Sequence, residues 1–218
     1  MKSEVTVLNT DKSIVGQIVA ELRDVKMQTD SMRFRQNIKR LGWLMAYEVS
    51  KELEYSKEAI TTPLGKAQEF IATDSVVLGT VLRAGLPFHQ GFLDIFDKAE
   101  NAYVGASRLE IEDKLPEIML GYSAGPKLEG KTLVMVDPMI ATGQSLVEAI
   151  ESLIKQNGEP KRIIVAGAIG AKSGIEYVQE KLPRARIYVA AVDAELNDKY
   201  YIVPGLGDAG DLALGPKN

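Results

Sequence analysis

From residue 75 onward, short apolar runs rich in β-branched residues alternate with segments long enough to form helices. The runs cover residues 76–81, 132–136, 163–168 and 187–192, and the longer segments cover 87–97, 144–156 and 174–181. Strands that are apolar along their whole length favour a parallel sheet covered on both faces. The sequence therefore predicts an α/β fold, with a doubly wound, mostly parallel sheet and helices on both faces.

The other segments fit one domain over residues 1–218, with an α/β core at 75–200. Residues 1–60 are expected to form an N-terminal helical segment, because apolar residues recur there at intervals of three and four. These residues are Ile14, Ile18, Leu22 and Val25, followed by Leu41, Leu44, Met45 and Val49. Thr61 and Thr62 before Pro63 are typical of a further helix start. Residues 108–131 are charged, then apolar, then bear glycine and proline, which indicates a hairpin or flap.

Composition excludes several classes of function. The 26 lysines and arginines against 30 acidic residues leave a net charge of −4, which argues against a dedicated nucleic-acid-binding protein. There is no cysteine, so disulfides, thiolate nucleophiles and cysteine-ligated metals are excluded. The single histidine, His89, leaves no histidine-rich zinc site and is expected to be structural or exposed. No run approaches the roughly 18 apolar residues of a membrane span, and the start lacks a signal-peptide core, so we expect a cytoplasmic protein.

Two glycine motifs match nucleotide-binding patterns but stand in the wrong context. Residues 125–132 match the P-loop pattern, yet a strand follows where the P-loop needs a helix. Residues 205–210 match the dinucleotide fingerprint, yet only eight residues remain for the βαβ unit that it must open. We therefore expect neither an ATPase nor an NAD-binding protein.

Residues 132–145 carry the clearest chemistry. A buried strand leads to Asp137 at its carboxyl end, then to a loop ending in Thr142, Gly143 and Ser145, and then to an amphipathic helix. Free N–H groups and the positive dipole end at a helix N-terminus attract anions, and Gly143 allows a close approach. The segment is therefore suited to a phosphomonoester, with Asp137 placed to accept hydrogen bonds from sugar hydroxyls. The alternative is a capped helix that binds no ligand.

This segment resembles the 5-phosphoribosyl 1-diphosphate (PRPP) loop of type I phosphoribosyltransferases. Pro138 replaces the second acid of most such loops, and the run Asp-Pro-Met-x-Ala-Thr-Gly-x-Ser is similar to that of the uracil phosphoribosyltransferase family. Residues 81–86 resemble the diphosphate loop of that family, residues 201–211 its uracil-binding hood, and residues 44–48 its N-terminal helix. The resemblance therefore assigns residues 200–218 to a base-binding hood and tail.

The resemblance also implies the site residues. Arg83 and Arg108 would contact the diphosphate of PRPP, and with Asp137 and Asp208 they form the implied catalytic set. The ribose and 5-phosphate would be held by the loop residues Asp137, Pro138, Met139, Ile140, Ala141, Thr142, Gly143, Gln144 and Ser145. Uracil would be held by Ile202, Gly207, Asp208 and Ala209, with Asp208 also facing PRPP or its metal.

The implied reaction is uracil plus PRPP giving UMP plus diphosphate, in pyrimidine salvage. The implied cofactor is Mg²⁺, held mostly by the substrate diphosphate and water, with Asp208 as a candidate protein ligand. The family generally forms homodimers or larger assemblies, for which the apolar N-terminal helices are a candidate interface. A cis peptide is implied between Leu82 and Arg83.

Three alternatives stay open. They are a phosphoribosyltransferase for another base, a PRPP-binding regulatory protein related to RNA-binding attenuators, and an inactive α/β binding protein. The sequence also departs from the family pattern. Gln144 replaces a usual glycine, so its side chain either points to solvent or crowds the 5-phosphate, and the C-terminal tail lacks the usual aromatic residue.

Overall fold

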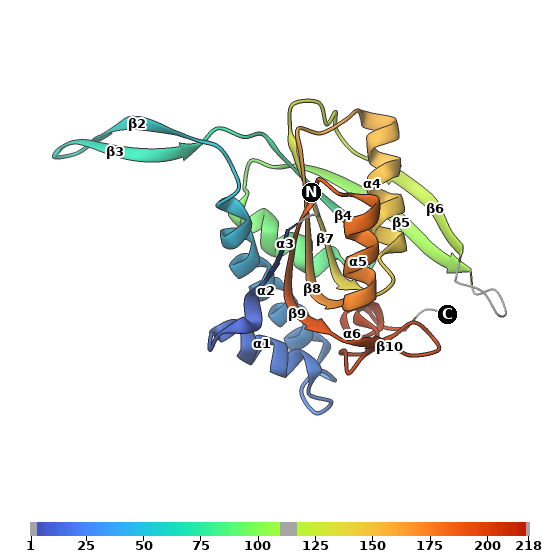
Figure 1. The fold of residues 1–218 in the computed structure, drawn as a ribbon. Helices are drawn as coiled ribbons and strands as arrows, with labels where there is room; N and C mark the ends of the chain where they lie inside the picture. The colour runs from blue at the N-terminus through green and yellow to red at the C-terminus, as the bar shows by residue number, and fades with distance from the viewer. Residues whose placement is uncertain (1–3, 110–116, 217–218) are drawn as a thin grey trace.

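A mostly parallel sheet forms the centre of the molecule. The structure, a computed structural model, describes residues 4–109 and 117–216. Within these ranges the sheet has seven strands in the order β1-β9-β8-β7-β4-β5-β6 (Figure 1). Their bounds are β1 Val5–Val7, β4 Val76–Leu82, β5 Glu100–Leu109, β6 Glu117–Ala124, β7 Thr132–Ile140, β8 Arg162–Ala171 and β9 Arg186–Asp193. All neighbouring pairs are parallel except β5 and β6. The predicted α/β fold is confirmed.

Helices cover both faces of this sheet (Figure 1). One apolar cluster joins the sheet to α1 (Ile14–Arg23), α2 (Ser31–Ser50), α3 (Leu86–Ile95) and α6 (Ala209–Leu214). A second joins its other face to α4 (Gln144–Asn157) and α5 (Lys172–Lys181). Along β7, Val134 and Val136 belong to the first cluster, and Leu133 and Met135 to the second. Alternate residues of β7 thus face two different apolar clusters, and this is why the whole strand is apolar.

The N-terminal third is not wholly helical, and the expected helix start at Thr61 and Thr62 is wrong. Strands β2 (Tyr55–Thr62) and β3 (Gly65–Ala72) form a separate antiparallel hairpin that projects from the body (Figure 1). Pro63 and Leu64 form its turn, since Thr62 pairs with Gly65. Threonine and proline serve turns as well as caps. Most hairpin side chains are exposed, so no burial pattern in the sequence could reveal the strands.

Strands β5 and β6 pair antiparallel at the edge of the sheet, from Tyr103 with Ala124 to Leu109 with Glu117. The segment predicted as a hairpin or flap, residues 108–131, includes β6 and the end of β5, and its residues 110–116 lie outside the described residues. Arg108 belongs to strand β5 rather than to a loop. Among the described residues, no helix has the length and apolar character needed to cross a bilayer.

His89 is structural, one of the two roles expected for it. It is 3% exposed within α3, and this burial lowers the pKa of its imidazole. The folded protein therefore holds His89 neutral at a pH where the unfolded chain, with an ordinary pKa near 6.5, binds a proton.

We predict that this difference makes stability depend on pH. The free energy of unfolding should fall as pH drops below about 6.5, by at most ~1.4 kcal/mol per pH unit from this group. Urea unfolding of the wild type and of His89→Gln between pH 7.5 and 5 measures it. The gap between the two proteins should narrow as pH falls, and a constant gap would contradict the prediction.

Candidate active site

The strand order places a crevice between β4 and β7. These parallel strands are neighbours, but α3 leaves β4 toward one face of the sheet and α4 leaves β7 toward the other. In open α/β sheets ligands bind at the carboxyl ends of the strands, where the winding reverses in this way. The segments that follow Leu82 and Ile140 therefore meet at the expected ligand site.

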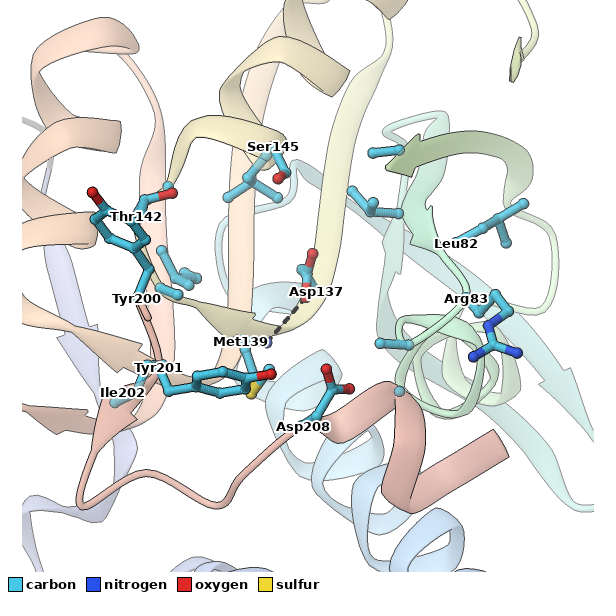
Figure 2. A pocket seen from close by; sticks show the side chains of 18 of the residues that line it. Leu82, Arg83, Asp137, Met139, Thr142, Ser145, Tyr200, Tyr201, Ile202 and Asp208 are labelled. Atoms are coloured by element: carbon cyan, nitrogen blue, oxygen red, sulfur yellow. Dashed lines mark hydrogen bonds between the residues drawn. The ribbon is translucent and has the colours of Figure 1, made fainter. Parts of the chain in front are cut away.

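A cavity of about 370 Å³ occupies this position (Figure 2). Its lining comes from four parts of the chain: residues 81–84 at the end of β4, Ala106 of β5, residues of the 137–146 segment from the end of β7 into α4, and residues of the C-terminal 199–210 segment. The asymmetry of the sheet thus brings together three segments that the sequence analysis singled out separately.

The loop after β7 has the form expected of an anion site. Gly143 adopts a φ of 79° as the residue before α4, a left-handed conformation that favours glycine. Thr142 and Ser145 line the cavity beside the first turn of α4, whose N–H groups have no partner within the helix. The dipole of α4 therefore favours a negative group at this end of the cavity.

Close packing against α5 holds this loop from behind. A Cβ atom on Gly174 would lie 2.0 Å from the carbonyl oxygen of Ala141, and one on Gly143 would lie 2.6 Å from the carbonyl oxygen of Gly174. No side chain fits between the two segments. Direct backbone contact with α5 therefore sets the position of this loop. We call residues 141–145 the phosphate loop, after the role predicted for them from the sequence.

Asp137 lies at the other side of this loop. Its Oδ1 accepts a hydrogen bond of 3.0 Å from the backbone N–H of Met139, two residues further along β7, which orients the carboxylate. Figure 2 shows Asp137 and Asp208 between the Thr142–Ser145 loop on one side and Arg83 on the other. Both carboxylates line the cavity.

Two predicted loop residues do not line the cavity. Pro138 is buried, and Gln144 lies outside the lining although the residues on either side of it belong to it. The Oε1 atom of Gln144 is buried without a hydrogen-bond partner in the described chain. Gln144 is partly exposed and lies outside the cavity lining, with the oxygen of its amide turned away from solvent. The other residues of the predicted loop line the cavity: Asp137, Met139, Ile140, Ala141, Thr142, Gly143 and Ser145.

Arg83 lines the opposite side of the cavity. The peptide bond from Leu82 to Arg83 is cis, as the family resemblance implied. The Arg83 side chain is exposed, and its Nη2 donates to the carbonyl oxygen of Gly215 at 3.2 Å. Arg108 lies in β5, but the structure does not describe its side chain.

The C-terminal segment closes the remaining side. Strands β10 (Glu195–Leu196) and β11 (Ile202–Val203) form a short hairpin, from which Ile202 reaches the cavity. Asp208 caps α6, accepting a hydrogen bond of 3.0 Å from the N–H of Asp211. The predicted residues Gly207 and Ala209 flank Asp208 but are not themselves part of the cavity lining.

Sequence reasoning named no substrate contact for three residues that line this side, Lys199, Tyr200 and Tyr201, although the last two fall in the segment assigned to the hood. Asn197 shapes their turn, since its Oδ1 accepts from the backbone N–H groups of Lys199 and Tyr201 at 3.0 and 2.9 Å. Asn197 before Asp198 is a turn signal. That signal could not show that the turn faces the cavity, which depends on the distant phosphate loop.

The cavity offers few side-chain ligands for a divalent metal ion. No cluster of three or more acidic, histidine or cysteine side chains exists in the described ranges. Asp137 and Asp208 are the two carboxylates of the lining. This donor set fits an ion that takes most of its ligands from substrate oxygens and water, as Mg²⁺ often does.

The chain is similar to known proteins over nearly its whole length. The family model for uracil phosphoribosyltransferase matches residues 9–215. A uracil phosphoribosyltransferase of Porphyromonas gingivalis is 45% identical, over 98% of this chain and 99% of its own length. One from Pyrococcus furiosus is 42% identical, over 94% of this chain and 88% of its own. The solved structure of the AQ2163 protein from Aquifex aeolicus superposes with a TM-score of 0.85 at 32% identity, covering 97% of this chain and 98% of that one.

We predict that a single methyl group between α5 and the phosphate loop impairs anion binding. Gly174→Ala must displace the Ala141 carbonyl, so it should destabilise the protein by about 1–3 kcal/mol and weaken PRPP binding. Calorimetric titration with PRPP and thermal unfolding measure both effects. Gly65→Ala, whose Cβ would meet nothing within 4 Å, is the control. Wild-type binding by Gly174→Ala would show that α5 does not set the loop position.

Proposed function

The chain belongs to the uracil phosphoribosyltransferase family, and from this premise we propose that it is an enzyme of pyrimidine salvage. In the proposed reaction, uracil and PRPP give UMP and diphosphate. The observation that carries the proposal is the cavity at the β4–β7 crevice, which lies between a helix-N-terminal phosphate loop and a C-terminal hood. A phosphoribosyl donor and a small planar base need these two different walls.

The 5-phosphate of PRPP binds the loop before α4 in this proposal. Thr142 and Ser145 supply hydroxyl donors, Gly143 allows close backbone approach, and the α4 dipole favours the negative charge. Asp137 accepts hydrogen bonds from the ribose hydroxyls. Its fixed position at the end of β7 supports this role, because the Met139 N–H already orients the carboxylate.

Uracil binds the hood, mainly through main-chain groups near Ile202 and along Gly207, Asp208 and Ala209. Gly205 and Gly207 have φ values of 56° and 91°, so the backbone there turns in a way that favours glycine. The edge of uracil alternates hydrogen-bond acceptors and donors, which carbonyl and N–H groups can match without a charged side chain.

The reaction joins N1 of uracil to the anomeric carbon of ribose as the bond from that carbon to the diphosphate oxygen breaks. The N1 proton passes to solvent, and the electron pair of the broken bond leaves with diphosphate. Arg83 and Arg108 stabilise the negative charge that grows on the leaving group. The phosphate loop and the hood hold the two reacting atoms in line, which contributes by positioning.

Mg²⁺ is the proposed cofactor. When bound, it would neutralise charge on the diphosphate. Asp208 and Asp137 are the residues that would hold it, with substrate oxygens and water completing its shell. We also propose that the enzyme works in the cytoplasm, because the charges of PRPP keep this substrate from crossing a membrane.

We propose further that the protein is a homo-oligomer and that the β2–β3 hairpin contacts a second copy. An isolated two-stranded hairpin is marginally stable in water, and exposed apolar clusters mark interaction surfaces. Leu64 is fully exposed and Phe70 is 69% exposed on this hairpin. The N-terminal helices are a weaker candidate, since their apolar residues pack into the core of the same chain.

Asp137→Asn tests the proposed function. The amide keeps an oxygen to accept from Met139 but loses the charge, so kcat/KM for PRPP should fall about 100-fold. Conversion of labelled uracil to UMP with PRPP and Mg²⁺ measures it, and Glu151→Gln, an exposed site on α4, is the control. Equal rates in wild type and Asp137→Asn would remove Asp137 from the site.

Assays of the wild-type protein with several bases decide between the proposed function and its alternatives. Conversion of another base in preference to uracil would reassign the hood. PRPP binding without product from any base would favour a regulatory protein instead.

Replacing the exposed apolar residues of the hairpin should reduce the oligomeric state. Leu64→Ser with Phe70→Ser removes apolar surface that we expect to be buried between copies. Sedimentation velocity at several concentrations measures the change. Val25→Ser, at a residue 72% exposed elsewhere, is the control and should leave the assembly intact. Unchanged sedimentation of the double variant would place the interface elsewhere.

A further inference from the structure

The hood segment between β11 and α6 is held by the end of α1, which lies far from it in the sequence. Arg23, the last residue of α1, forms a bidentate ion pair with Asp193, the last residue of β9. Its Nη2 lies 2.8 Å from Oδ1 of Asp193, and its Nη1 lies 2.9 Å from Oδ2. Asp193 is only 8% exposed, so solvent screens this pair weakly.

The same ion pair binds both polar main-chain groups of Gly205. Arg23 Nη1 donates to the carbonyl oxygen of Gly205 at 3.2 Å, and the N–H of Gly205 donates to Asp193 Oδ2 at 3.0 Å. Gly205 has a φ of 56°, and a Cβ there would lie 2.1 Å from the carbonyl oxygen of Ile202. The turn after Ile202 is therefore fixed by close contact on one side and by two hydrogen bonds on the other.

Gln28 extends this attachment by one residue. Its Nε2 donates to the carbonyl oxygen of Leu206 at 3.2 Å, and also to those of Leu22 and Arg23 at 2.9 and 3.3 Å. One amide group thus joins the C-terminal carbonyls of α1 to the hood. Helix C-terminal carbonyls lack partners within the helix, so this contact also satisfies α1.

We propose that Arg23, Asp193 and Gln28 are positioning residues that set the base-binding hood and thereby the affinity for uracil. The held residues, Gly205 and Leu206, lie between Ile202 and Gly207, the two sides of the proposed base site. None of the three positioning residues lines the cavity, so they act through the backbone of the hood. Among the described residues, no hydrogen bond or ion pair joins them to the phosphate loop or to Arg83, so PRPP binding should be little affected. This inference rests on the proposed function.

Asp193→Asn in the full-length protein tests the inference. The variant keeps the shape of the side chain but weakens the bond to Arg23, and a hydrogen bond to a charged group is worth about a factor of ten or more. We expect the KM for uracil to rise at least ~10-fold while the KM for PRPP changes less than about 3-fold. Arg23→Lys keeps the charge but loses the bidentate geometry, so it should raise the KM for uracil to an intermediate extent.

Glu21→Gln is a matched control on the same helix. Its carboxylate is also buried and also pairs with an arginine, 2.7 Å from Arg33 Nη2, and it accepts from Asn37 at 2.7 Å. No hydrogen bond joins Glu21 to the hood, so this variant should leave both KM values unchanged. If Asp193→Asn raises both KM values equally, or neither, the inference is overturned.

Hydrogen exchange provides a readout that does not need activity. The backbone amides of Val203 and of residues 205–208 should exchange faster in Asp193→Asn than in the wild type and Glu21→Gln, because the bond from Gly205 is weakened. Equal exchange would overturn the inference. If Asp193→Asn does not fold, Gln28→Ala, which removes the Leu206 contact, should show the same selective changes. A wild type that makes no UMP would refute the proposed function, while the exchange result would still test the attachment.

Discussion

The side-by-side pairing of β4 and β7 is the constraint on which the rest of the site depends. The two strands run parallel from the pair Val76–Thr132 to the pair Thr80–Val136, and the buried hydroxyl of Thr80 donates to the carbonyl oxygen of Val136 at 3.0 Å. Because the chain leaves these strands toward opposite faces, their carboxyl ends stay uncovered. Arg83 and Asp137 therefore face one cavity although 54 positions separate them in the chain.

Each wall of this cavity is held by a different kind of interaction. Backbone packing between Gly174 and Ala141 sets the phosphate loop, which leaves little room for adjustment. The hood is set by the Arg23–Asp193 ion pair, whose strength depends on charge and geometry together. In the proposed function, the rigid loop would bind the phosphate the same way in every cycle, and the separately attached hood would allow base affinity to change without altering that loop.

Local patterns in the sequence predicted the α/β core correctly, including the strand, loop and helix at residues 132–157, and failed where burial was the missing information. The apolar runs became β4, β7, β8 and β9, because their pattern reports burial on both faces. The β2–β3 hairpin was missed because its exposed residues carry no such pattern. Gln144 was judged from its place in a motif, whereas its side chain lies outside the cavity between two residues that line it.

Local sequence was enough to predict the alternation of strands and helices and the glycine turn before α4, since each depends on neighbours within about one turn or strand. Which segments meet depends instead on the packing of the whole chain. Arg23 and Asp193 are 170 positions apart, and nothing near either residue indicates the other. Their pairing follows from the packing of α1 beside β9, because contacts between distant segments depend on how the whole sheet is covered.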